Sequence, residues 1–153
     1  MATLKERIDA DLKDAMRSKN ELTLSVVRML KSAVKYKEVE PGAAALDDAG
    51  VQKVIATLIK QRRDSIQQFN DAGRPELAQK EEQEIAVLQN YLPQQLSAQE
   101  LEQLVQAAVA ESGAQSAKDM GAVMKAVGPK VAGRSEGRAV SEAVKAALAK
   151  LGG

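Results

Sequence analysis

Apolar residues recur at every third or fourth position along most of the chain, and nowhere do they alternate with polar residues for long enough to predict a β-strand. A spacing of about 3.6 residues places such side chains on one face of a helix, whereas a half-buried strand needs a period of two. Alanine, leucine, lysine, glutamate and glutamine are abundant, and all of them favour helices. The sequence therefore predicts an all-α fold.

Capping residues and helix breakers divide this pattern into seven predicted helices. Ser, Thr, Asp and Asn side chains accept hydrogen bonds from the first free N–H groups of a helix, so they mark its start. The predicted helices begin after Thr3, Asn20, Asp47 or Asp48, Gly73, Ser97 and Ser116, and after the loop 133–137. Gly73 is expected to end the third helix in a left-handed conformation, and Pro75 to start the fourth. Gly128 and Pro129 are expected to break the sixth helix.

The best candidate for a domain boundary is the segment 93–96. Pro93 cannot continue a helix, and Ser97 begins a capping box that starts a new one. All three aromatic residues of the chain precede this segment. We therefore predict two small helical bundles, a four-helix N-terminal unit at 1–92 and a three-helix C-terminal unit at 97–153.

The chain contains no cysteine and no histidine. These absences exclude a disulfide framework, a thiolate nucleophile, Cys-ligated zinc and the commonest general base. The one concentrated group of acids is Glu81, Glu82 and Glu84. We interpret it as a solvated helix face, with acid–base catalysis by two carboxylates as the alternative. We expect no catalytic residue, no metal site and no cofactor.

Hydropathy and charge limit the surroundings of the chain. No stretch approaches the roughly 18 apolar residues that a membrane-spanning helix needs. The N-terminus carries charged residues at once, without the apolar segment of a signal peptide. The formal net charge of +1 gives no general attraction to membranes or nucleic acids. We therefore expect a soluble, cytoplasmic protein with no membrane partner.

A basic segment near the C-terminus is the clearest candidate binding site, because residues 118–153 carry a net charge of +4. The candidate RNA-binding residues are Lys118, Lys125, Lys130, Arg134 and Arg138. Gly133 lies beside Arg134 in a loop whose N–H groups could meet a phosphate. Gly121, inside a predicted helix, would be explained by a close helix approach or by a ligand. The alternative is a tight turn that needs glycine, with basic residues that keep a small domain soluble.

Two further groups of basic residues lie in the N-terminal half. Arg28, Lys31 and Lys35 share one stripe of the second predicted helix, and residues 28–37 contain no acid. Such strips are usually only solvated, but they can also bind phosphates. A second group consists of Lys60, Arg62 and Arg63. These residues could bind phosphates or a partner's carboxylates, or they could pair within the chain with Asp64 or with Glu81 and Glu84 of the fourth helix.

Two regions of the chain resemble the YqeY-like family. The central one includes Lys60–Ile66, Gly73-Arg74, Glu84-Ile85 and Tyr91–Pro93, and the C-terminal one includes Asp119–Lys125 and Lys130–Arg134. The C-terminal motif also resembles the end of GatB, the tRNA-handling subunit of the glutamine-dependent tRNA amidotransferase. The resemblance covers most of the chain and implies two small helical bundles. It also implies contact with tRNA, and the residues that match the shared motif are Gly121, Met124, Lys125, Gly133 and Arg134.

Three functions follow from these observations. The leading hypothesis is a non-catalytic helical module that binds tRNA or a tRNA-dependent enzyme, such as an amidotransferase or a synthetase. The second is a protein-interaction adaptor that uses an uncovered apolar stripe of the long third helix. The third is an auxiliary subunit of a carbon–nitrogen ligase with glutamine as amido donor, which is the activity that the resemblance alone would suggest. The oligomeric state stays open.

Overall fold

The computed structural model describes residues 2–152, and over that range the chain is helical and forms no strand. The all-α prediction is confirmed. The helices are α1 (Leu4–Ser18), α2 (Glu21–Glu38), α3 (Asp48–Asp71), α4 (Pro75–Gln89), α5 (Ala98–Ser112), the short 3-10 helix η1 (Ala117–Asp119), α6 (Met120–Val131) and α7 (Gly137–Gly152). They group into two compact units, of which the first ends at Leu92 and the second begins at Pro93.

The predicted capping residues start the helices as expected. The side chains of Thr3, Asn20 and Asp47 each accept a hydrogen bond from a backbone N–H in the first turn of the helix that follows. Ser97 does the same for α5, and its hydroxyl also donates to the Glu100 carboxylate. These bonds satisfy N–H groups that have no partner inside the helix. Local sequence therefore determines where these helices start.

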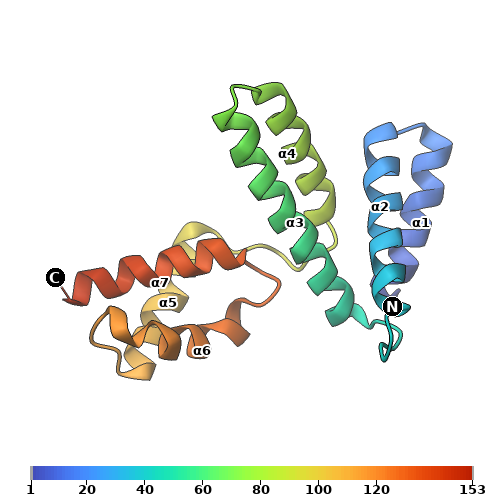
Figure 1. Cartoon of the computed structure of the whole chain (residues 1–153). Coiled ribbons are helices and arrows are strands. Elements are labelled where there is room, and N and C mark those ends of the chain that lie inside the picture. The colour runs from blue at the N-terminus through green and yellow to red at the C-terminus, as the bar shows by residue number, and fades with distance from the viewer. Residues whose placement is uncertain (1, 153) are drawn as a thin grey trace. The chain divides into compact units, whose positions relative to one another are not determined.

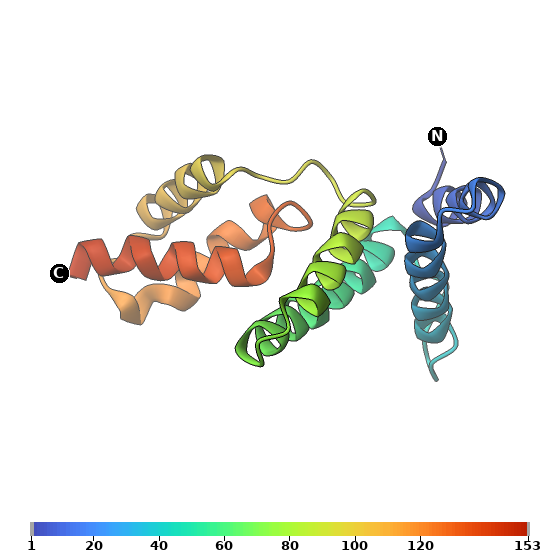
Figure 2. The ribbon, with the colours of Figure 1, turned by 90° about the horizontal axis from the view of Figure 1, so that it is seen from above.

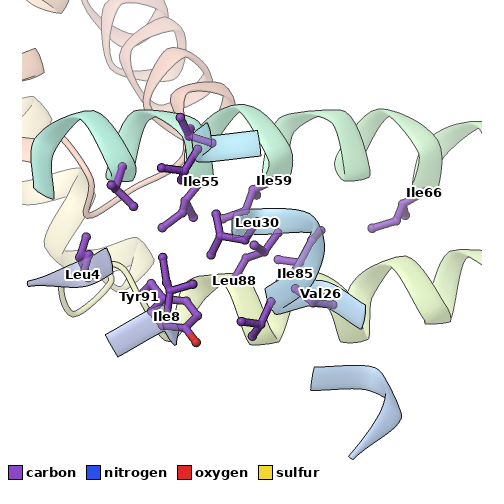
Figure 3. Packing of buried hydrophobic residues seen from close by; sticks show 14 of the residues in the cluster. Leu4, Ile8, Val26, Leu30, Ile55, Ile59, Ile66, Ile85, Leu88 and Tyr91 are labelled. Atoms are coloured by element: carbon purple, nitrogen blue, oxygen red, sulfur yellow. The ribbon is translucent and has the colours of Figure 1, made fainter. Parts of the chain in front are cut away.

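Two helical hairpins form the first unit, α1 with α2 and α3 with α4 (Figures 1 and 2). Their apolar faces meet in one core, to which all four helices contribute (Figure 3). Leu30, Ile55 and Leu88 are fully buried at its centre. Tyr91, just after α4, closes the core and turns its hydroxyl toward the Asp11 carboxylate, at an O–O distance of 2.5 Å.

The second unit is built from α5, η1, α6 and α7, and each of its three α-helices packs against the other two (Figure 1). Its core is smaller, and valine predominates in it. The buried residues are Leu101, Val105, Ala108, Val123, Val127, Val131, Val140, Val144 and Leu148.

One predicted helix end is wrong. Gly128 and Pro129 do not break α6, which continues to Val131 with the proline in its last turn. Proline removes one backbone N–H, and its ring crowds the backbone N–H and the Cβ of the residue before it. Gly128 has no Cβ, so the helical conformation at this position is less strained. A Cβ built on Gly128 would meet nothing within 4 Å, so tertiary packing does not explain this glycine.

Candidate nucleic-acid interface

Lys125 and Lys130, both on α6, point to different sides of the helix. Val123, Val127 and Val131 define its buried face, and the exposed Lys125 lies on the opposite side. Five residues along a helix rotate a side chain by about 140°. Lys130 therefore leaves α6 on another side, where its ammonium lies 3.0 Å from the Glu111 carboxylate of α5. These two lysines do not form one phosphate site.

The glycine loop after α6 is held by the segment that precedes α5. The backbone N–H of Leu96 donates to the carbonyl of Arg134 at 2.8 Å, and the Gln95 side chain donates to the carbonyl of Gly133 at 2.9 Å. The Arg134 guanidinium donates to the Gln94 carbonyl at 3.3 Å. Both the guanidinium and the loop therefore have partners within the unit.

Two of the loop's own N–H groups are also occupied. Those of Arg134 and Ser135 both donate to the carbonyl of Val131, at 2.9 and 3.2 Å. These two are therefore not available to a phosphate. Gly133 has a φ of +74°, a left-handed conformation that other residues adopt with strain. The tight-turn alternative accounts for this glycine.

Gly121 lies in the first turn of α6, and a Cβ built on it would meet nothing within 4 Å. A close approach of another helix therefore does not explain this glycine, and that part of the sequence interpretation is wrong. The remaining candidates of this segment, Lys118 on η1 and Arg138 in the first turn of α7, are exposed. The predicted basic residues are thus distributed over η1, α6, the loop and α7.

Arg62 of α3 is held within the first unit, as the pairing alternative predicted. Its Nε lies 3.2 Å from Glu84 and 3.9 Å from Glu81, both on α4. Its other nitrogens donate to the Leu58 carbonyl and to the Met29 sulfur. The side chain is only 13% exposed, so it links α2, α3 and α4 instead of facing a ligand. Of its neighbours in the sequence, Lys60 is exposed and Arg63 is half-buried.

The glutamates of α4 divide between two environments. Glu81 and Glu84 turn toward Arg62, whereas Glu82 is exposed. Burial, and then the neighbouring Glu84 charge, raise the pKa of Glu81. Within residues 2–152 no group of His, Cys, Asp or Glu is arranged to hold a metal ion.

The solvent side of α2 carries exposed cations and an exposed aromatic residue. Lys31 lies 2.8 Å from Asp9 of α1. Arg28 and Lys35 are exposed, two turns apart on the same face. Tyr36 follows Lys35 in the sequence, lies about 80–100° around the helix from these two cations, and is 72% exposed. We call Arg28, Lys35 and Tyr36 the α2 strip.

Tyr36 was missed as a site residue by the sequence analysis. A signal for it exists, because Val27, Leu30 and Val34 define the buried face of α2. Tyr36 falls on the opposite side of the helical wheel. A large aromatic residue on a solvent face that also carries two cations is typical of surfaces that stack on unpaired bases.

The third helix offers no uncovered apolar stripe. Its apolar residues Val51, Ile55 and Ile59 are buried in the core of the first unit. The adaptor hypothesis therefore loses the surface on which it was first based. None of the helices between residues 2 and 152 has an apolar segment long enough to cross a bilayer.

Comparison with known proteins identifies relatives over most of the chain. The family model described as "Yqey-like protein" matches residues 5–148. A protein of the fungus Pyrenophora tritici-repentis, "Altered inheritance of mitochondria protein 41, mitochondrial", is 34% identical over 125 residues, which cover 77% of this chain and 67% of that protein.

Yeast proteins with the same name are also similar. The one from Lachancea thermotolerans is 39% identical over 92 residues, or 60% of this chain and 49% of its own length. The one from Kluyveromyces lactis is 41% identical over 81 residues, or 53% of this chain and 44% of its own length. The chain thus spans about half the length of these curated relatives.

These names contradict one expectation from the sequence. The predicted cytoplasmic location is wrong by this comparison, because the names of the relatives place those proteins in mitochondria. Charge and hydropathy do not distinguish one aqueous compartment from another, so the sequence analysis had no physical basis for choosing between them.

Proposed function

Since the chain belongs to the YqeY-like protein family, we propose that it is a non-catalytic helical module that binds tRNA. The observation that carries this proposal is the α2 strip, where two exposed cations and an exposed tyrosine lie on the solvent side of one helix. The resemblance of the C-terminal motif to the end of GatB supports tRNA as the RNA.

The α2 strip suits an RNA with unpaired bases. The cations Arg28 and Lys35 contact phosphates, which supply affinity but no sequence information. Tyr36 stacks on an unpaired base, an interaction that tolerates any base because each has a π-face. Unpaired loops and ends are the usual sites of such contacts in folded RNA. The strip therefore favours tRNA loops or its single-stranded end over a regular duplex.

The second unit adds phosphate contacts in this proposal. Lys118 and Lys125 are exposed, whereas Lys130 and Arg134 already contact other groups of the unit. The first two therefore contribute more to RNA affinity than the last two. Separate contacts on both units would increase the salt dependence of binding without adding base specificity.

Binding of labelled bulk tRNA to the full chain, followed by fluorescence anisotropy at two salt concentrations, tests the proposal. Replacing Arg28 and Lys35 with Gln should weaken binding, and should lower the salt slope by about 0.7–0.9 for each phosphate that the variant no longer neutralises. Tyr36→Ala should weaken binding by about 1–3 kcal/mol, the usual value for one stacked base, while Tyr36→Phe should retain the affinity.

The matched control replaces Lys13 and Lys53, two exposed lysines of the same unit outside the strip, with Gln. This variant loses the same charge and should bind nearly as well as the parent. Equal losses in both double variants would refute the α2 strip as the site. A parent chain that binds no tRNA at low salt would reject the proposed function in favour of a protein partner, such as an amidotransferase or a synthetase.

The non-catalytic part of the proposal has its own test. Incubation of the purified chain with glutamine, ATP and misacylated tRNA should yield no amidated product. Turnover that a point substitution in this chain abolishes would show an activity of its own.

A further inference from the structure

The second unit has an open groove between α5 and α7, with a volume of about 1130 Å³. Buried Leu101 and Val105 of α5 line it, and alanines make up much of the α7 wall. Ligand pockets for small molecules have volumes of about 300–1000 Å³ and enclose most of their ligand. The α5–α7 groove is larger and open, so it suits a segment of a macromolecule better than a small molecule.

The length of the groove matches a helix. Its lining runs from Ala98 to Ala110 along α5 and from Ala139 to Leu151 along α7. At 1.5 Å per residue, each wall is about 18 Å long, or more than three helical turns. Leu151 at one end is a large apolar side chain that remains 51% exposed. An apolar stripe at i, i+3, i+4 and i+7 of a partner helix would cover such a surface.

The charges along the groove indicate which partner helix would bind there. Glu102 of α5 and Glu142 of α7 line its two walls. The third glutamate of α5, Glu111, pairs with Lys130 of α6 and does not line the groove. Lys150 is the single cation of the lining and lies near the end of α7. Basic residues on both flanks of the apolar stripe would therefore find one acidic partner on each wall.

We propose that the α5–α7 groove binds an amphipathic helix of a partner protein, with Lys and Arg on both flanks of its apolar stripe. An anionic membrane surface is a poorer occupant, because the glutamates on the walls would repel it. This binding site goes beyond the proposed binding of tRNA and does not depend on it.

Binding of a labelled synthetic helix to the full chain tests the proposal. The probe is a peptide of about 18 residues with Leu and Ala at the stripe positions and Lys on both flanks; a second peptide has the same stripe and Glu on its flanks. In anisotropy titrations, the Lys peptide should bind at least about tenfold more tightly than the Glu peptide. Replacing Glu102 and Glu142 with Gln should reduce this preference. Equal affinities of the two peptides for the parent chain would overturn the proposal.

Two pairs of exposed alanines provide matched variants. Ala110 and Ala146 line the groove, whereas Ala107 and Ala149 lie on the same helices outside it. Gln at the first pair should fill the groove with polar atoms and weaken binding of the Lys peptide by at least about tenfold. Gln at the second pair should leave the affinity unchanged, and circular dichroism should show both variants folded. Equal effects of the two pairs would refute binding in the groove.

Two further measurements separate this proposal from its alternatives. Sedimentation of the parent chain detects self-association. A dimer that the Ala110→Gln/Ala146→Gln variant abolishes would make a second copy the occupant and overturn the assignment to a partner protein. The same variant should bind tRNA as the parent does, so failure of the groove proposal and failure of the proposed tRNA function give different results.

Discussion

The two units of this chain build their cores from side chains in different proportions. Among the described residues, the first core has five valines, but also five isoleucines, three leucines and Tyr91, around Leu30, Ile55 and Leu88. Six of the nine buried core residues described for the second are valines, and alanines make up much of the α7 wall of its groove. Larger side chains remove more apolar area from water, and a unit of about 60 residues buries a smaller fraction of its surface. The first unit should therefore be the more stable one.

Polar contacts increase the expected difference in stability between the two units. In the first unit, the backbone N–H of Leu4 donates to the Asp48 carboxylate at 2.9 Å and so joins the starts of α1 and α3. Lys5 pairs with Glu38 across α1 and α2. In the second unit, the loop after α6 is held at one end, while the α5–α7 groove stays open. The comparison indicates that the first unit provides most of the stability and that the second leaves apolar surface exposed for binding.

Leu30→Ala should have the largest effect. Removing a fully buried leucine leaves a cavity and destabilises a protein by about 2–5 kcal/mol. Hydrogen exchange of the full chain in increasing urea should show this loss in amides of the first unit, with little change in those of the second. Val39→Ala, an exposed position next to α2, is the control and should change little. Equal destabilisation of both units would show that they unfold together.

Tyr91→Phe should destabilise the first unit by about 1.5–3 kcal/mol, because it removes a hydrogen bond to a carboxylate. Burial, followed by the hydrogen bond to Asp11, raises the pKa of Tyr91 above its ordinary value. In the unfolded chain the phenol ionises near pH of about 10. The contribution of Tyr91 is therefore fully present below that pH and is lost as the pH rises above it.

Urea unfolding at neutral pH measures the stability that Tyr91→Phe loses. The same measurement above about pH 10 tests whether the contribution of Tyr91 disappears there. The parent chain should lose stability over this range more steeply than Tyr91→Phe. The exposed Tyr36→Phe is the matched control and should follow the parent at every pH. Parallel pH profiles of the parent and Tyr91→Phe would contradict the assignment to this phenol.

Val127→Ala tests the smaller core. Each buried CH₂ contributes about 0.8 kcal/mol, so the loss with its cavity should be about 2 kcal/mol. The second unit is expected to be the less stable one. Even this loss should therefore speed up hydrogen exchange of its most protected backbone amides, to rates close to those of solvent-exposed amides. Lys125→Ala, on the outer side of the same helix, should leave them protected. Slow exchange maintained in Val127→Ala would show that the second unit is the more stable one.

Glu81→Gln should have the smallest effect, a stabilisation of the first unit by less than about 1 kcal/mol at neutral pH. The raised pKa of Glu81 means that the fold disfavours its charged form. This penalty is present near neutral pH and disappears once the pH falls below the unfolded value of about 4.3, where both states are protonated. Urea unfolding at both pH values measures it, with the exposed Glu82→Gln as control. A variant less stable than the parent at neutral pH would show that pairing with Arg62 outweighs burial.

The functional surfaces were less predictable than the helices. The sequence left two interpretations of Arg62, phosphate binding or pairing with the glutamates of the fourth helix, and the structure shows the pairing. The sequence also predicted one basic site from Lys125, Lys130 and Arg134, of which the last two find partners in the same unit. A side chain's partners come from elements far away in the sequence, so its formal charge does not show whether that charge is available.

Local sequence by itself determined that the chain is helical, where most helices start, and which face of each is buried. These properties depend on contacts within a few residues, such as the capping of α1 by Thr3 and the left-handed turn at Gly73. Only the tertiary structure decided that Arg62 is enclosed, that Tyr36 stays exposed, and that α5 and α7 leave a groove between them. The reason is physical: helix formation is a local equilibrium, whereas exposure of a side chain depends on how closely distant faces of the chain pack.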